Sequence, residues 1–406
     1  MKSDLDRLME ERGFDALIVY GPAEGNAPLR YLSNGAKVTH ATVVKKRGEQ
    51  PVLVVGGMER DEAARSGLPI VLDTEFNFHQ HYKDTGDRFE TTLRMYVEMF
   101  EHFDLSGTVS FYGISSPGAA LVFLTELGKR LPHVTLTGEA TRSIFDEAGI
   151  TKDADEIAAL HTVAERTNAV MAETIAFIRS HAVEDEQLLK EDGTPLTVGD
   201  VKRQVRARLL YYGLEEAHDM IFAIGRDGGV PHSRGEENAP LELGKAIVFD
   251  LFPRDPVTGY FHDMTRTFSL GYAAEEVQHA YEQVMQAFNA VMDELAVGQP
   301  TARYQDLVCD IFEEHGHKTP RSEPGTTEGY VHSLGHGIGI NLHESPTFRE
   351  HSEDILAAGQ VFTIEPGLYY PDKGFGIRVE DTIYIDPEGG IHSLTPTPKD
   401  LVIPIP

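Results

Sequence analysis

The stretch from Ala246 to Phe268, AIVFDLFPRDPVTGYFHDMTRTF, constrains the fold more than any other part of the chain. Two β-rich runs flank a loop that is punctuated by proline and glycine, which predicts a β-hairpin. Each run carries one aspartate, Asp250 in the first and Asp263 in the second. Asp250 lies in an otherwise apolar strand, where burying a lone carboxylate is costly. The hairpin therefore needs a cation beside its aspartates, either an arginine or a metal ion.

Composition narrows the class of protein and its surroundings. A chain of 406 residues is long enough for two domains and a large core. A net charge of −29 argues against nucleic acid and anionic membranes as partners. The single cysteine, Cys309, excludes an internal disulfide and a zinc finger. The charged N-terminus lacks a signal-peptide core, and no apolar run approaches the ~20 residues of a membrane span. We therefore expect a cytoplasmic protein.

Residues 1–150 alternate strands with helices, which predicts a compact α/β domain. The expected helices are 2–12, 58–65, 88–103 and 117–131, and the expected strands are 15–20, 41–46, 51–56, 68–72 and 108–112. The strands 41–46 and 51–56 should pair as a hairpin.

Residues 151–406 have a different pattern. Apolar residues at three- and four-residue steps predict a long amphipathic helix at 151–178. A mostly polar loop should follow at 184–197, and Thr197 with Asp200 predicts the start of the next helix. The remaining expected elements are a helix at 198–212, a strand at 220–225, the hairpin, helices at 274–295 and 304–314, and strands to the end. The order helix, helix, strands thus occurs twice, which indicates a weak internal duplication.

Three later segments carry further acids and histidines. They are HSLGHGIGINLHE at 332–344, VFTIEPGLY at 361–369 and GIRVEDTIY at 376–384. Histidines among glycines are a poor choice for packing, because glycine fills no space and a histidine needs partners. Strand alternation places Arg378 and Glu380 on one face of the last segment.

Four carboxylates, those of Asp250, Asp263, Glu365 and Glu380, stand at the ends of apolar strands. Each one alone can be explained as an exposed strand end or one half of an ion pair. Clustered together they would repel strongly, and cations of total charge about +4 would relieve this repulsion. Two divalent ions match that charge. Oxygen-rich ligation with one imidazole suits Mn(II), Co(II) or Zn(II).

These segments resemble the metallopeptidases with the pita-bread fold, in the branch that contains aminopeptidase P and prolidase. The resemblance covers about residues 150–400. It implies five metal ligands, namely Asp250, Asp263, His336, Glu365 and Glu380. It also implies accessory residues for catalysis and substrate binding, namely His232, His332, His343, Tyr369 and Arg378. The implied fold is a small creatinase-like α/β domain at 1–150 and a pita-bread α+β domain with a pseudo-two-fold repeat at 151–406.

The resemblance also implies a mechanism, in which two divalent ions activate a water against an Xaa-Pro bond. Glu365 is then expected to carry the proton of the water to the leaving nitrogen. His232 or His343 is expected to stabilise the oxyanion. Arg378 is expected to orient ligands rather than to touch substrate. For His332, a role in holding its loop and a role in catalysis are both open.

Two departures from the family pattern stand out. Similar proteins usually have a glycine two residues after the first aspartate, where this chain has Phe252. The loop before Asp263 is also lengthened around RDPVT. Because the ligands themselves are intact, only the shape of the loop is put in question.

The choice between dipeptidase and aminopeptidase P depends on how the substrate's end is bound. A dipeptidase must bind the free carboxylate of a C-terminal proline, which favours a cation near the site. Arg349 is the one arginine between the HESP motif and Glu365. This favours an Xaa-Pro dipeptidase, with aminopeptidase P as the alternative. Pairing of Arg349 with Glu350 or Glu353 is the competing interpretation.

Other functions on the same fold agree less well with these residues. A non-catalytic binding protein or a creatinase-type amidinohydrolase would be expected to lack one or more ligands, and all five are present. A methionine aminopeptidase does not match the extra N-terminal domain. We therefore expect small proline-containing peptides as substrates and, on the resemblance, a homodimer.

Overall fold

The computed structural model describes residues 1–113 and 115–406 of the chain. The chain forms two compact units, each with its own hydrophobic core. The N-terminal unit comprises Met1–Gly149 with Val257–Gly259, and the C-terminal unit comprises Ile150–Pro256 with Tyr260–Pro406. In the part of the chain that the structure describes, no helix has the length and apolar character to span a membrane.

The N-terminal unit is built on a six-stranded mixed sheet in the order β4-β3-β2-β1-β5-β6. Its strands are β1 (Ala16–Gly21), β2 (Ala41–Lys46), β3 (Val52–Val55), β4 (Ile70–Leu72), β5 (Gly107–Gly113) and β6 (Val134–Thr137). Strand β2 pairs antiparallel with β3, so the expected hairpin is confirmed. β1 pairs in parallel with β5, and the chain between them passes through three strands and four α-helices.

Seven α-helices accompany this sheet in residues 1–113 and 115–149. They are α1 (Leu5–Glu11), α2 (Ala27–Leu32), α3 (Arg60–Ala64), α4 (Phe78–Thr85), α5 (Arg88–His102), α6 (Pro117–Arg130) and α7 (Ile144–Gly149). The side chain of Asp87 accepts hydrogen bonds from two backbone N–H groups at the start of α5, which explains why that helix begins there. The sequence analysis did not predict α4, a short helix in which no side chain is buried.

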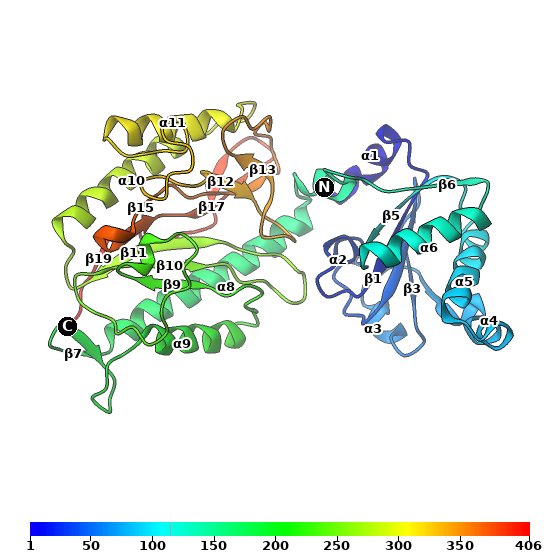
Figure 1. Cartoon of the computed structure of the whole chain (residues 1–406), viewed down its shortest axis with the longest axis horizontal. Coiled ribbons are helices and arrows are strands. Elements are labelled where there is room, and N and C mark those ends of the chain that lie inside the picture. The colour runs from blue at the N-terminus through cyan, green and yellow to red at the C-terminus, as the bar shows by residue number, and fades with distance from the viewer. Residues whose placement is uncertain (114) are drawn as a thin grey trace. The chain divides into compact units, whose positions relative to one another are not determined.

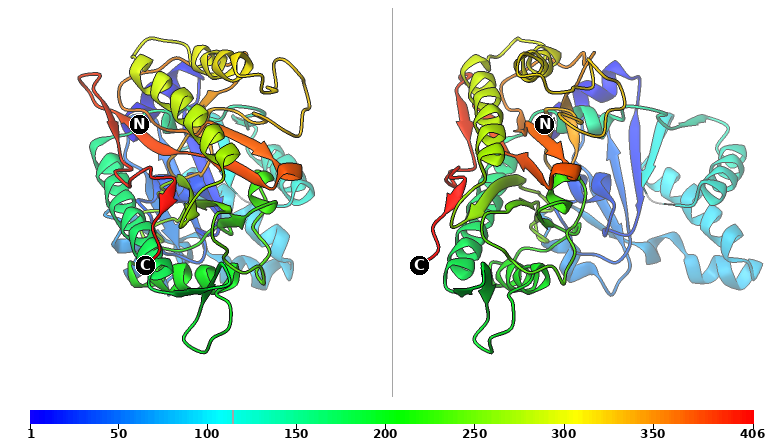
Figure 2. Two further views of the ribbon diagram at one scale, coloured as in Figure 1. Left: turned by 90° about the vertical axis from the view of Figure 1, so that its left-hand side faces the viewer. Right: turned by 60° about the vertical axis from the view of Figure 1, so that its left-hand side comes forward.

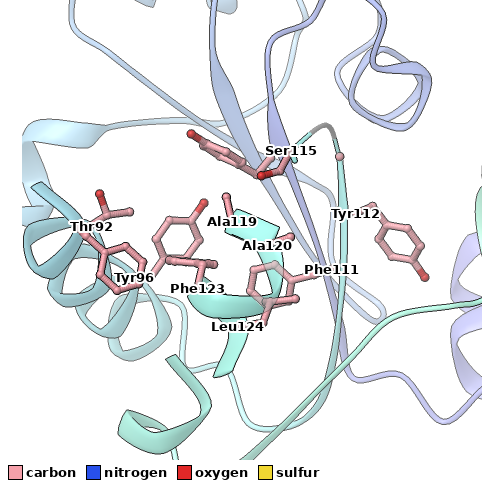
Figure 3. Close-up of a pocket in the computed structure, with 12 residues that line it drawn as sticks. Thr92, Tyr96, Phe111, Tyr112, Ser115, Ala119, Ala120, Phe123 and Leu124 are labelled. Carbon is pink, nitrogen blue, oxygen red and sulfur yellow. The ribbon is translucent and has the colours of Figure 1, made fainter. Parts of the chain in front are cut away.

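A cavity of about 300 Å³ lies within the N-terminal unit, between α5, α6 and β5. Figure 3 shows aromatic rings around it, including those of Tyr96, Phe111 and Phe123. The rings of Tyr96 and Phe123 meet edge to face at 4.9 Å. Tyr96 belongs to the hydrophobic core of this unit, and Phe111 and Phe123 pack against that core. The cavity is therefore an opening in the core.

The C-terminal unit contains four α-helices, arranged in two packed pairs. They are α8 (Ala154–Arg179), α9 (Val198–Tyr211), α10 (Glu275–Glu294) and α11 (Ala302–Glu314). At the start of α9 the Thr197 hydroxyl accepts from the backbone N–H of Asp200, and the Asp200 carboxylate accepts from that of Thr197, as predicted. Figure 1 shows strands between the pair α8 and α9 and the pair α10 and α11, and Figure 2 shows the same helices from two further directions.

Two larger sheets run between these helices. One has the order β19-β11-β10-β9 and the other the order β13-β12-β14-β17-β18. The first contains β9 (Ile221–Ile224), β10 (Ala246–Leu251), β11 (Met264–Leu270) and β19 (Val402–Ile403). The second contains β12 (Gly335–Gly337), β13 (Glu344–Phe348), β14 (Val361–Ile364), β17 (Asp381–Ile385) and β18 (Ile391–Ser393). Apart from β19, which follows both pairs, the strands of each sheet follow their own pair of helices in the sequence, as the repeated element order predicted.

Two small hairpins complete the unit. They pair β15 (Gly367–Tyr370) with β16 (Phe375–Arg378), and β7 (Ala182–Glu184) with β8 (Gln187–Leu189). Most of 184–197 is loop, as expected, but the end of β7 and the whole of β8 fall within this range. The turn residues of this second hairpin, Asp185 and Glu186, both have φ above zero, which is the geometry of a tight hairpin turn. Glycine or asparagine usually marks such a turn, so this sequence did not signal it.

The register of the central hairpin sets the direction of both aspartates. β10 and β11 pair antiparallel, with Asp250 opposite Thr265. Residues opposite each other point to the same face, and Asp263 follows the alternation two residues before Thr265. Both aspartates therefore point to one side of the sheet, toward the residues described next.

Candidate metal centre

Five side chains from both large sheets converge in the C-terminal unit. Asp250 lies in β10, Asp263 immediately before β11, His336 in β12, Glu365 after β14 and Glu380 immediately before β17. The His336 Nε2 atom lies 3.7 Å from Asp263 Oδ2 and 3.5 Å from Glu365 Oε1. Asp263, His336 and Glu380 each offer one ligand atom, and these atoms all lie within 4.8 Å of one another. A bridge between Thr265 and Glu380 connects the two sheets at this point.

The hydrogen bonds and the pKa values of the carboxylates show whether this cluster is able to bind cations. Asp250 Oδ1 and Asp263 Oδ1 are buried, and neither has a hydrogen-bond partner within the described residues. Burial, followed by the charges of neighbouring carboxylates, raises the pKa of Asp263 and of Glu380 well above the usual range. Burial raises the pKa of Glu365 to about 8. Unsatisfied oxygens and crowded negative charge are the features that bound divalent cations would compensate, so the donor set fits them.

His336 is prepared to act as a neutral ligand. Its Nδ1 atom lies 3.0 Å from the carbonyl oxygen of Gly337 and must therefore carry the ring proton. The lone pair of Nε2 is then left facing the carboxylates of Asp263 and Glu365. Burial lowers the pKa of His336 to about 3, so the ring is neutral at physiological pH. A histidine whose other nitrogen is fixed by a backbone carbonyl is the usual form of a metal-binding imidazole.

Arg378 lies at one side of the cluster and binds Asp250. It is buried, and it forms an ion pair with Asp250. It also donates hydrogen bonds to Thr265 Oγ1 at 3.0 Å, to the Tyr369 hydroxyl at 2.8 Å and to the Pro231 carbonyl at 3.4 Å. Because the guanidinium is fully enclosed by these partners, it fixes Asp250 in position and does not face open solvent.

His332 and Tyr369 extend this network. The Nδ1 atom of His332 lies 2.7 Å from the Ser333 carbonyl, so Nε2 is an acceptor. The Tyr369 hydroxyl, 2.9 Å from Nε2, donates to it and accepts from Arg378. Burial lowers the pKa of His332 to about 4 and raises that of Tyr369 to about 12. A continuous hydrogen-bonded chain thus runs from His332 through Tyr369 and Arg378 to Asp250.

His343 and His232 lie at the open side of the site. Both residues are exposed overall, but part of the His343 ring is covered where it meets that of His336 edge to face at 4.3 Å. Burial lowers the pKa of His343, and the nearby positive charges of His232 and His218 lower it further. The structure therefore places His343 against the ligand His336, with His232 and His218, the latter not singled out from the sequence, close enough to act on His343.

Arg349 is placed differently. It is exposed and follows the last residue of β13. Across residues 1–113 and 115–406 it forms no ion pair, so the expected alternative of pairing with Glu350 or Glu353 is wrong. No contact of Arg349 with the ligand residues is seen in the same part of the chain.

Thr265 is a residue of the site that the sequence analysis missed. Its hydroxyl donates to Glu380 Oε2 at 2.7 Å and accepts from Arg378 Nε at 3.0 Å. A signal was available, because Thr265 stands two residues after Asp263 in the same β-run and must share its face. No comparable signal exists for partners that come from distant segments.

The chain belongs to metallopeptidase family M24, because residues 158–387 match the model of that family. All five converging residues lie within the matched range. A sequence relative is the Xaa-Pro dipeptidase of Pyrococcus furiosus, 32% identical over 212 residues. That alignment covers 51% of this chain and 57% of the relative, so the chain spans just over half the length of this curated relative.

Solved structures show the same fold over nearly the whole chain. The prolidase from Pyrococcus horikoshii OT3 has a TM-score of 0.74 at 23% identity and covers 98% of this chain and 99% of its own. The X-Pro aminopeptidase from Thermotoga maritima MSB8 has a TM-score of 0.76 at 21% identity, covering 98% and 100%. These similarities establish the pita-bread fold with its N-terminal α/β part. Because proteins with both names share it, the fold alone does not choose between the two activities.

Proposed function

We propose that this protein is a dinuclear metal-dependent exopeptidase that hydrolyses Xaa-Pro bonds, specifically an Xaa-Pro dipeptidase. The observation that carries the proposal is the convergence of four carboxylates, three of them buried, and one neutral imidazole from two sheets. Membership of metallopeptidase family M24 supports the peptidase assignment. The name of the Pyrococcus furiosus relative supports the choice of a dipeptide over a longer peptide.

Asp250, Asp263, His336, Glu365 and Glu380 are the residues that would hold the metal ions. Bound there, two divalent cations supply Lewis-acid polarisation of a peptide carbonyl and lower the pKa of a water molecule. The oxygen-rich donor set with one imidazole suits Mn(II), Co(II) or Zn(II). The Oδ1 atoms of Asp250 and Asp263 have no hydrogen-bond partner in the described chain and are therefore available as metal ligands.

Side chains around the ligands would move the protons and bind the substrate. Glu365, held by a hydrogen bond from Thr363 at 3.4 Å, would take a proton from the attacking water. It would then deliver that proton to the proline nitrogen, which has no N–H of its own and must be protonated to leave. His343, neutral because its pKa is lowered, would donate an N–H to the carbonyl oxygen, with His232 as the alternative donor.

The network behind the ligands would keep them in place without touching substrate. Arg378 fixes Asp250, and the Tyr369 hydroxyl fixes Arg378 and His332 together. For His332 this favours a supporting role, since its two ring nitrogens are both occupied by protein partners. Such partners commonly contribute about 10–100-fold to metal affinity or activity.

Metal titration tests the proposal directly. The protein is stripped with a chelator, and Mn²⁺ is returned while hydrolysis of Ala-Pro is followed. We expect no cleavage without metal and a rise in activity that is complete at about two equivalents. Full activity in rigorously metal-free protein would exclude the proposed chemistry. Saturation at one equivalent would exclude the dinuclear form.

Arg349 offers a test of dipeptidase against aminopeptidase P. Its unpaired guanidinium remains the cation proposed from the sequence to bind the C-terminal carboxylate. Replacing Arg349 by Ala should then raise KM for Ala-Pro far more than for Ala-Pro-Ala. Equal effects on the two substrates, or faster cleavage of the tripeptide by the unmodified enzyme, would favour aminopeptidase P.

We also propose a cytoplasmic homodimer. The single buried cysteine is compatible with a reducing compartment, and the dimer rests on resemblance to the family. The chain has a mass of 44.9 kDa, so light scattering should give about twice that value. A mass near that of one chain would show a monomer.

A further inference from the structure

Arg234 carries a guanidinium that is held by segments next to the candidate metal centre. The side chain is exposed, yet two contacts hold it in place. Its Nη1 atom donates to the backbone carbonyl of Asp219. Its Cζ atom lies 5.7 Å from the centre of the Phe252 ring, in a cation–π contact. An arginine fixed in this way has lost much of its freedom before any ligand binds.

Two segments connect Arg234 to residues of the metal centre. Phe252 is buried and follows Asp250 by two residues, so the ring that supports Arg234 belongs to the same strand run as a ligand. On the other side, Arg234 lies two residues after His232, in a segment whose Pro231 carbonyl accepts from Arg378. Arg378 in turn pairs with Asp250. Arg234 is therefore anchored on two sides to segments that contact one ligand.

The position of His218 independently indicates that Arg234 lies near the open side of the site. It precedes Asp219, whose carbonyl binds Arg234. The charges of His218 and His232 both act on His343, which touches the ligand His336. The segments on either side of Arg234 thus both face the open side of the site.

Other cations near the centre are already paired. Arg378 is buried against Asp250, Arg254 donates to Glu215 at 2.7 Å, and Lys152 pairs with Glu344 at 2.8 Å. Arg234, in contrast, forms no ion pair within the residues that the structure describes, and the backbone carbonyl of Asp219 carries no formal charge. Within the described residues its guanidinium donates to that carbonyl alone, so its other N–H groups are available to a ligand.

We infer that Arg234 binds a carboxylate of the substrate and so determines which peptides this site accepts. The inference rests on the proposed peptidase function and adds a specificity residue to it. A planar guanidinium with free N–H groups is the side chain best matched to a carboxylate. The carboxylate is that of the C-terminal residue or that of an acidic side chain, and the experiment below separates the two.

This role also accounts for Phe252, the departure from the family's glycine. A glycine there has no side chain on which a guanidinium could rest. The aromatic ring supplies that support, and the ring itself is buried rather than open to substrate. Phe252 is then a positioning residue for Arg234.

The experiment compares three variants of the Mn²⁺-loaded protein. Arg234→Met removes the charge and keeps the bulk, while Phe252→Leu removes only the support. Arg226→Met is the matched control, because it removes an equal charge from another exposed arginine of the same connection between β9 and β10. KM and kcat are measured on Ala-Pro, Ala-Pro-amide and Glu-Pro-amide. Thermal unfolding confirms that each variant is folded.

We expect Arg234→Met to raise KM by about ten-fold or more for a substrate whose carboxylate it binds. A rise for Ala-Pro with Ala-Pro-amide unchanged assigns the C-terminal carboxylate. A rise confined to Glu-Pro-amide assigns an acidic side chain. Phe252→Leu should show the same substrate pattern with a smaller rise, and Arg226→Met should leave all three KM values within about two-fold.

Two kinds of failure are distinguishable. If the unmodified protein cleaves Ala-Pro but Arg234→Met changes all three substrates equally, or none, Arg234 has no such role and the proposed function stands. If Arg226→Met reproduces the effect, general charge and not Arg234 is responsible. If the loaded, unmodified protein cleaves none of the three, the proposed function itself fails, and the inference fails with it.

Discussion

Lys152 and Glu344 form a buried ion pair, with Lys152 Nζ 2.8 Å from Glu344 Oε2, although they are 192 positions apart in the sequence. The other carboxylate oxygen of Glu344 accepts from the backbone N–H of Asn341 at 2.9 Å. The carboxylate also packs on Gly339, where an added Cβ would meet it at 2.5 Å. The segment between His336 and His343 is therefore folded around a charge that Lys152 neutralises.

Replacing Lys152 by Met should leave Glu344 buried and unpaired. Removing one partner of a buried pair typically costs about 3–5 kcal/mol of unfolding free energy, measured by urea denaturation. We also expect a lower kcat, since His343 is carried by the loop that loses its support. The matched control is Lys129→Met, which breaks an exposed pair with Glu126 and should cost less than about 1 kcal/mol. Equal losses for the two variants would contradict the structural role of Lys152.

The metal-free protein should lose stability as the pH rises from 6.5 to 8. The pKa of Glu365 is raised to about 8 from 4.5, so the folded state retains a proton that the unfolded state has released. Stability then falls with rising pH, by about 1.4 kcal/mol per pH unit for each such proton. Asp263 and Glu380, whose pKa values are also raised, act in the same direction.

The window above pH 6.5 is chosen because the buried histidines do not contribute there. The pKa of His336 is lowered to about 3 and that of His332 to about 4, so their effect on stability lies below the ordinary histidine value of 6.5. Thermal unfolding at several pH values measures the trend. Adding Mn²⁺ should abolish the decline, and Glu365→Gln should reduce it. A metal-free protein equally stable at pH 6.5 and 8 would contradict the carboxylate cluster.

Replacing Tyr369 by Phe should interrupt the chain from His332 to Asp250. The change leaves His332 Nε2 and one N–H of Arg378 without their partner, at a cost of about 1–3 kcal/mol for each buried group left unpaired. We expect kcat to fall as well, because Arg378 orients Asp250. Tyr330→Phe is the control, since the hydroxyl of this equally buried tyrosine donates to Gln305 and forms no hydrogen bond to a ligand residue within the described part of the chain. A control variant as inactive as Tyr369→Phe would show that activity follows stability alone.

Replacing Asp263 by Ala should abolish activity and metal binding without unfolding the protein. In metal-free buffer the variant should be as stable as the unmodified chain or more so, because one of four crowded charges is gone. Elemental analysis and calorimetry measure the two effects. Normal turnover with bound metal in this variant would overturn its assignment as a ligand. Glu380→Ala should behave in the same way.

The sequence by itself determined the strands and the acids that end them. Two β-rich runs around a loop with proline and glycine, between Ala246 and Phe268, predicted the hairpin, and its register places Asp250 and Asp263 on one face. The helix start at Thr197 was equally local and was confirmed. Short elements without such a pattern were not predicted, and the tight turn at Asp185 and Glu186 is one of them. Family membership followed from motifs that are each contiguous in the chain.

Only the tertiary structure decided which distant residues complete the site. The pairing of Lys152 with Glu344 and the position of Arg234 between Asp219 and Phe252 depend on how separate segments pack, and local spacing carries no information about that. The same holds for the His332 ring, whose tautomer is set by Ser333 and Tyr369 and whose pKa is lowered by burial. Burial shifts proton affinities by desolvation, and desolvation depends on everything packed around a group. The residues next to a group in the sequence therefore do not determine its pKa in the folded protein.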